Sequence, residues 1–285
     1  MNSEQDYMKL LDLLARVVEA NKGPLDGADD RFLGAEELVN KFFLHAASVL
    51  YLSRGTELEL PALPNAQFKF LDPGSVNVLA RAVLETFLAF HYIFVQPKTL
   101  EEQNCRYWAW KAAGLTWRQN LSVSVEEHRQ KLAEEKEKIG DFHSKLKSND
   151  AFQKLSKDQK KRVLEGKWKL QPWPKIAESA SLAKNLPTNE RIYGYLCEYA
   201  HSGSLSTLQI TQAGLNKEQL FLIQFTMDYI PIVIANFIRE YCDLLPRAKA
   251  ALTADTEGSD IVDTWVQIGQ KLDVETPSQD EYENS

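Results

Sequence analysis

The sequence predicts an all-α protein: a multi-helix bundle with a charged helical hairpin projecting from it. Apolar residues recur at three- and four-residue spacing through most of the chain, which is typical of amphipathic helices. No segment alternates strand with helix, so a parallel sheet is not expected. With 285 residues, 44% of them hydrophobic, the chain is long enough to bury a core without disulfides.

Two helices and a small hairpin are predicted first. Residues 6–20 and 35–52 each carry apolar residues along one helical face, and the breaker cluster at 21–24 ends the first helix. Residues 57–60 and 67–70 then alternate with period two across a segment that contains prolines. This pattern favours one small β-hairpin, with an ordered loop as the alternative.

The middle of the chain predicts one apolar helix and a charged pair. Residues 75–95 are apolar around most of the helical circumference, which predicts a central position in the bundle, and Pro97 closes this helix. An aromatic-rich helix is expected at 100–119. Charged helices at 125–146 and 157–165 carry few apolar residues, so we expect them to form the projecting hairpin.

Helices are also predicted at 175–184, 189–200 and 216–245. The last of these is apolar enough to suggest a membrane span, but Asp228 near its middle would cost several kcal/mol, on the order of 3, in a bilayer. We therefore predict a buried core helix and no membrane segment. A weak amphipathic turn follows at 261–272, and the last ten or so residues are expected to be disordered.

These elements predict three parts of the chain. A helical core comprises 1–124 and 170–252, the charged hairpin is an insert at 125–169, and an acidic, partly disordered tail covers 253–285. The three cysteines are far apart, which suits a reducing cytoplasm.

Charge is distributed unevenly along the chain. The net charge is −7, which argues against bulk attraction to nucleic acid. Residues 129–169 nevertheless hold 13 basic and 7 acidic side chains, whereas 253–285 hold 9 acidic side chains and one lysine. The partners we expect are therefore a protein or a second copy at the helical faces, with RNA at the basic stretch 129–169 as the further prediction.

Familiar catalytic signatures are absent from the sequence, and we predict neither a metal nor a cofactor. Cys197 and His201 are four residues apart on one helical face, but two ligands do not make a zinc site.

One polar constellation joins two distant segments. Arg81 and Glu85 are four residues apart in the apolar helix and face the same way. Burial of an arginine is costly unless it is paired, and Glu85 is the nearest partner. The second segment carries Tyr195 and Tyr199 on one face, with His201 and Ser202 at the helix end.

If the two segments pack together, two interpretations are open. One is a buried polar network that fixes how two helices dock. The other is acid–base chemistry on a phosphodiester, with His201 as acid or base and Arg81 at the phosphate. Asp228 and Gln224 share a face of the long helix and are candidates to line the same centre.

Three short motifs resemble a known family. R-A-V-L-E from Arg81, W-P-K-I-A from Trp173 and Y-L-C-E-Y-A-H-S from Tyr195 are similar to a microbial all-helical family, the domain of unknown function 5677, over 40–212. The resemblance implies a helical fold and a shared polar centre at matching positions, and it implies no reaction. Those positions are Arg81, Glu85, Trp173, Tyr195, Tyr199 and His201.

A looser resemblance is to HEPN-type ribonucleases, whose motif places arginine and histidine four to six residues apart on one helix. Here Arg81 and His91, like Arg191 and His201, are ten apart and about 80° off one face. Such a site would have to form between helices or across a dimer.

The first hypothesis is therefore a sensing or binding module, part of a bacterial stress or phage-defence system, with a buried Arg/Glu/Tyr/His centre. The alternative is a metal-independent, HEPN-like endoribonuclease with Arg81, Glu85 and His201 as catalytic residues. A third class is a pure scaffold. The residues that we expect to bind a ligand are Tyr195, Tyr199, Ser202, Trp173 and Asp228.

Overall fold

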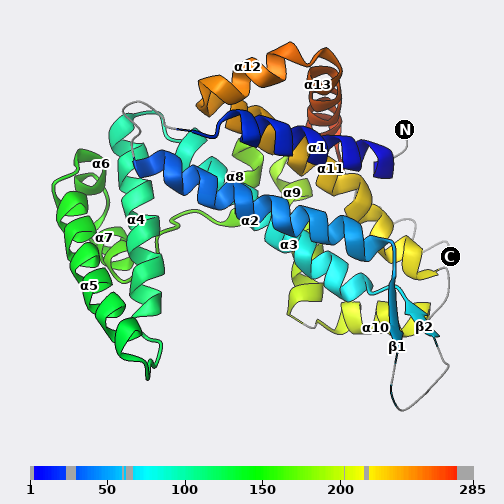
Figure 1. Cartoon of the computed structure of the whole chain (residues 1–285), viewed down its shortest axis with the longest axis horizontal. Coiled ribbons are helices and arrows are strands. Elements are labelled where there is room, and N and C mark those ends of the chain that lie inside the picture. The colour runs from blue at the N-terminus through cyan, green and yellow to red at the C-terminus, as the bar shows by residue number, and fades with distance from the viewer. Residues whose placement is uncertain are drawn as a thin grey trace. The chain divides into compact units, whose positions relative to one another are not determined.

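The computed structural model describes residues 3–23, 30–59, 61, 67–201, 203–214 and 218–274. These residues form thirteen α-helices, one π-helical turn and a two-stranded antiparallel sheet (Figure 1). The predicted all-α fold with one small β-hairpin is confirmed. The chain divides into two compact units: Met1–Ala89 with Trp173–Ser285, and Phe90–Pro172.

The first unit holds most of the helices. Its elements are α1 (Ser3–Ala20), α2 (Asp30–Ser53), β1 (Thr56–Glu59), β2 (Gln67–Phe70), α3 (Pro73–Phe90), α8 (Trp173–Ser179), α9 (Leu186–Ala200), α10 (Ser204–Ala213), α11 (Glu218–Leu244), α12 (Pro246–Ala254) and α13 (Thr256–Lys271). The hairpin pairs Thr56 with Phe70 and Glu59 with Gln67.

The core of the first unit forms around α11, because this helix is apolar on nearly all sides. Phe237 of α11 meets Phe42 of α2 at 4.2 Å and Phe87 of α3 at 5.9 Å between ring centroids. The phenol of Tyr7 in α1 donates to the carbonyl of Ala46 in α2 at 2.9 Å, so a buried polar tip is satisfied where two helices cross.

The C-terminal part of this unit is more ordered than an acidic tail suggests. The helix α13 buries Val262, Trp265 and Val266, and it contacts both α1 and α11 (Figure 1). An added Cβ at Gly269 would lie 2.5 Å from Ile232, so glycine allows α13 to approach α11 closely. The predicted disorder of the last ten or so residues falls within 275–285, outside the described residues.

The second unit contains the π turn η1 (His91–Val95), α4 (Leu100–Arg118), α5 (Glu126–Lys147), α6 (Asp150–Gln153) and α7 (Lys157–Leu164). It comprises more residues than the predicted insert 125–169, because α4 packs along α5 and belongs to the same unit. The buried residues of its small core are Cys105, Ala109, Leu146, Phe152 and Val163.

The predicted helix 175–184 differs from the structure: α8 ends at Ser179. Ser181 there has φ 56°, a left-handed conformation that interrupts the helix. The short helices α6, α10 and α12 and the π turn were not predicted, because segments of four to ten residues carry too little periodicity.

Two helical segments, Pro73–Val95 and Glu218–Leu244, are long and apolar enough to cross a membrane by length and composition alone. Packing buries 67% and 72% of their most apolar windows, and core helices of soluble proteins pass the same test.

Candidate functional site

Two polar side chains on α3 form one half of the candidate site. Arg81 and Glu85 are one turn apart, and Nε of Arg81 donates to Oε1 of Glu85 at 2.9 Å. Their side chains are 17% and 30% exposed. The charge of Arg81 is therefore partly withdrawn from water, and it is balanced by a carboxylate on the same helix.

The other half comes from α9. His201 is the C-cap of this helix, and its backbone N–H donates to the carbonyl of Cys197 at 3.0 Å. Tyr193 lies eight residues earlier on this helix, on the stripe that runs through every fourth residue to His201. The imidazole is exposed whereas the phenol is half-buried, so the site opens to solvent on the histidine side.

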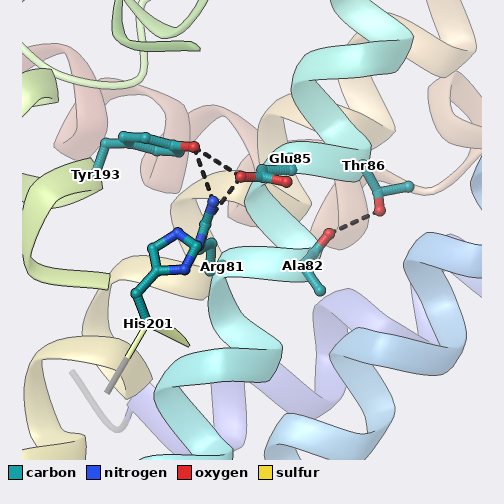
Figure 2. A network of polar contacts seen from close by, with 6 residues as sticks. All are labelled: Arg81, Ala82, Glu85, Thr86, Tyr193 and His201. Carbon is teal, nitrogen blue, oxygen red and sulfur yellow. Dashed lines mark hydrogen bonds and ion pairs between the residues drawn. The ribbon is translucent and has the colours of Figure 1, made fainter. Parts of the chain in front are cut away.

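These four side chains form one connected network (Figure 2). Nη1 of Arg81 contacts Nε2 of His201 at 2.9 Å, and Nη2 donates to the Tyr193 hydroxyl at 3.2 Å. That hydroxyl in turn donates to Oε1 of Glu85 at 2.7 Å. The guanidinium thus contacts a carboxylate, a phenol and an imidazole through three different nitrogens. We call this network the polar centre.

The contact with Arg81 restricts the form of the histidine ring that can make this hydrogen bond. A guanidinium only donates hydrogen bonds, so Nε2 of His201 must accept and the ring proton must lie on Nδ1. A doubly protonated imidazole would have no acceptor and would place a second positive charge beside Arg81. The contact between the two side chains therefore exists only with a neutral histidine.

Burial and hydrogen bonding shift two ionisation equilibria in the polar centre. Burial opposes the charge on Arg81, but the hydrogen bond to Tyr193 and the attraction of Glu85 outweigh it and raise the Arg81 pKa. Burial, followed by the hydrogen bond to Glu85, raises the pKa of the Tyr193 phenol well above its usual range. At neutral pH the centre thus holds a guanidinium and a neutral phenol.

The structure brings together Arg81, Glu85 and His201, the three residues proposed from the sequence as a catalytic set. Sequence reasoning missed Tyr193. Its signal was present: Tyr193, Cys197 and His201 recur at four-residue spacing, which places them on one stripe of α9.

Tyr195 and Tyr199 lie elsewhere, because residues two apart on a helix are about 200° apart around its axis. The Tyr195 hydroxyl reaches the carbonyl of Leu222 in α11 at 3.3 Å. The Tyr199 hydroxyl donates to Oε1 of Gln209 in α10 at 2.9 Å. Both tyrosines contact neighbouring helices and are not part of the polar centre.

Of the remaining predicted ligand residues, Asp228 has its hydrogen bonds with side chains outside the polar centre. Asp228 is exposed on α11, where it accepts hydrogen bonds from Ser3 at 2.6 Å and from Gln224 at 3.0 Å. Trp173 begins α8 and is half-buried. Ser202 lies outside the described residues.

The binding chemistry of the polar centre comes from its cation. Among the described residues, no group of three or more histidine, cysteine or acidic side chains is placed to hold a metal ion. Arg81 is the one cation of the centre, and the exposed His201 ring lies beside it. Such an arrangement can bind an anionic oxygen or take part in proton transfer.

Comparison with known proteins gives one match. No curated protein and no solved structure shows significant similarity to the chain. A family model, described as the family of unknown function DUF5677, matches residues 68–218, a range that contains all four residues of the polar centre. Since the match covers more than half of the sequence, the chain belongs to the DUF5677 family.

Proposed function

We propose that the chain is a ligand-sensing module in which an anionic group exchanges with His201 at Arg81. The observation that carries this proposal is the contact of 2.9 Å between Arg81 Nη1 and Nε2 of an exposed, neutral imidazole. A carboxylate or phosphate oxygen adds the attraction between opposite charges to the hydrogen bond with a guanidinium, and a neutral imidazole does not. A carboxylate or phosphate oxygen therefore competes effectively with the imidazole for Nη1.

The other contacts of Arg81 favour an exchange at this one nitrogen. Nε is held by the Glu85 carboxylate at 2.9 Å and Nη2 by the half-buried Tyr193. These partners keep the guanidinium in place while the solvent-facing nitrogen changes partner. A preorganised cation of this kind binds an anion without first having to be ordered.

His201 is well placed to transmit the exchange. It caps α9, and α10 begins at Ser204, so the ring sits at the corner between two helices. Its contact with Arg81 ties this corner to α3. When an anion displaces the imidazole, the contact between α3 and the α9–α10 corner is lost. The free and anion-bound states then differ in this contact.

The test uses anion titration of the full chain by calorimetry, with inorganic phosphate and acetate as probes. His201→Ala should bind the probe more tightly than the wild-type protein, because no imidazole has to be displaced. Arg81→Met should abolish binding, and Tyr195→Phe, on the same helix but outside the polar centre, is the matched control. Weaker binding by His201→Ala, or no binding by any form, would contradict the proposal.

A metal-independent ribonuclease is the second candidate, and one observation favours it. The arginine–histidine pair that such a site needs is formed here between two helices. Against it, Nε2 of His201 is occupied by Arg81 and is not available as a base until that contact opens. RNA cleavage in EDTA by the wild type, lost in His201→Ala at unchanged melting temperature, would favour this candidate over the sensor.

The expectations about the setting of the protein stay predictions. They are a protein partner or a second copy at the helical faces, RNA at 129–169, a role in bacterial stress or phage defence, a cytoplasmic location, and the absence of a membrane segment.

A further inference from the structure

The second unit contains a cavity of about 500 Å³. It lies between the first half of α4, the helices α6 and α7, and the segment that follows α7. All its lining residues fall between Tyr92 and Gln171, so it belongs to this unit alone. The volume is within the range of small-molecule sites, roughly 300–1,000 Å³.

The cavity contains a cation, Arg106, whose position follows from the π turn. In that turn the N–H of Gln96 donates to the carbonyl of His91 at 2.8 Å, five residues back. The corresponding donor for the Tyr92 carbonyl would be Pro97, which has no N–H. Nη1 of Arg106 supplies the missing donor, at 2.7 Å from the Tyr92 carbonyl and 2.6 Å from Oε1 of Gln96.

The same arginine is stacked on one aromatic ring, which itself packs against a second. Its guanidinium carbon lies 4.1 Å from the centroid of the Tyr92 ring, and this ring meets that of Trp168 at 5.8 Å. Nε and Nη2 of Arg106 make no hydrogen bond with the described part of the chain. The cavity wall therefore combines two aromatic rings with a planar cation that has donors to spare, which suits a planar ligand with acceptors on its edge.

The charges of the lining restrict the ligand further. Three carboxylates, Glu101, Glu102 and Asp150, line the cavity together with two cations, Arg106 and Lys154. This balance disfavours a ligand with several negative charges. It favours a ring that has both acceptors for Arg106 and amino donors for carboxylates, which is the edge pattern of a nucleobase.

The cysteine in the lining does not make the cavity a reactive site. Burial raises the pKa of the Cys105 thiol to about 11, so the group is neutral at ordinary pH. The thiolate is the nucleophilic form of cysteine. The chemistry of this cavity is therefore binding.

We propose that this cavity binds an uncharged nucleobase or nucleoside. The ligand ring packs against Trp168, and its acceptor edge receives hydrogen bonds from Arg106, which Tyr92 holds in place. The carboxylates of the lining accept from exocyclic amino groups and repel phosphorylated forms. The inference depends on the second unit only and is independent of the function proposed for the polar centre.

The test is calorimetric titration of the full chain with adenosine, guanosine, cytidine and uridine, and with their 5′-monophosphates. At least one nucleoside should bind with a Kd below about 1 mM, and its monophosphate should bind no more tightly. Trp168→Leu removes the stacking ring, and Arg106→Lys keeps the charge but removes the planar fork. Each should weaken binding by about ten-fold or more.

The matched control is Trp117→Leu. Trp117 is 68% exposed on α4 and does not line the cavity, so binding should stay within about two-fold of the wild type. Trp168 also packs on the small core, so the melting profiles of the variants are compared with that of the wild type. If Trp168→Leu does not fold, the binding of nucleosides by Arg106→Lys tests the proposal. The proposal is overturned if no nucleoside binds, if Arg106→Lys binds as well as the wild type, or if a monophosphate binds about ten-fold tighter than its nucleoside.

Discussion

Each unit of the chain contains an arginine beside a tyrosine ring, and the two pairs are built differently. Arg81 lies 5.4 Å from the Tyr193 ring centroid and is balanced by the carboxylate of Glu85. Arg106 lies 4.1 Å from the Tyr92 centroid, and its hydrogen-bond acceptors are a carbonyl and an amide oxygen. The first arginine joins two helices through an ionic network, whereas the second caps the end of a helix.

The two environments shift the arginine pKa in opposite directions. Hydrogen bonds and the Glu85 charge overcome burial and raise the pKa of Arg81. Burial dominates at Arg106 and lowers its pKa. The comparison shows that a buried guanidinium can be retained either by a fixed counter-charge or by carbonyl groups that would otherwise lack donors.

The largest effect is expected for Arg81→Met, which leaves the Glu85 carboxylate without its cation. We expect the free energy of unfolding to fall by about 2 kcal/mol, measured by urea denaturation. Arg81→Met/Glu85→Gln should recover part of this loss, because no stranded charge remains. Equal stability of the single and double variants would show that the two side chains are not coupled.

A smaller loss, about 1–1.5 kcal/mol, is expected for Arg106→Met, because the Tyr92 carbonyl loses its donor. The double variant Arg106→Met/Glu102→Gln should recover none of this stability. Among the described residues, no carboxylate accepts a hydrogen bond from Arg106. Recovery in this double variant would mean that the two arginines are held in the same way.

Tyr193→Phe should cost about 1 kcal/mol, because the hydroxyl links Arg81 with Glu85. Tyr195→Phe is the matched variant two residues along α9. Its hydroxyl contacts are longer, 3.3 and 3.4 Å, so we expect less than about 0.5 kcal/mol. A larger loss of stability for Tyr195→Phe than for Tyr193→Phe would contradict the assignment of Tyr193 to the polar centre.

The smallest effect is expected in alkaline solution. The folded-state pKa of Tyr193 is raised above the ordinary 10.0, first by burial. The Tyr193 phenol contributes fully to stability below the unfolded pKa of 10.0. This contribution is lost as the pH rises toward the folded pKa, because the phenol of the unfolded chain ionises first. The melting temperature of Tyr193→Phe should therefore fall less steeply than that of the wild type above about pH 10. Parallel curves would contradict this.

Much of the fold could be predicted, because long helices carry many periods of apolar residues. The hairpin at 57–60 and 67–70 followed from period-two alternation and is observed one residue earlier in its first strand. The short helices α6, α10 and α12 were missed. The π turn was missed as well, because its cause, Pro97 at the end of an apolar helix, also fits an ordinary helix stop.

The candidate site was predictable only in part. The cost of burying Arg81 pointed to Glu85, and the position of His201 at a helix end drew attention to it. Tyr193 was missed because the prediction relied on Tyr195 and Tyr199, which share a different face of the helix. The four-residue spacing from His201 through Cys197 also reaches Tyr193. The cavity of the second unit was not predictable, since its lining comes from four helical elements and a loop.

The most direct test of the central claim is the ring nitrogen spectrum of His201, recorded by long-range proton–nitrogen NMR at neutral pH. We predict a neutral ring protonated at Nδ1, with the Nε2 resonance shifted by its hydrogen bond to Arg81, and the loss of that shift in Arg81→Met. A proton on Nε2, or a spectrum that does not respond to Arg81→Met, would contradict this prediction.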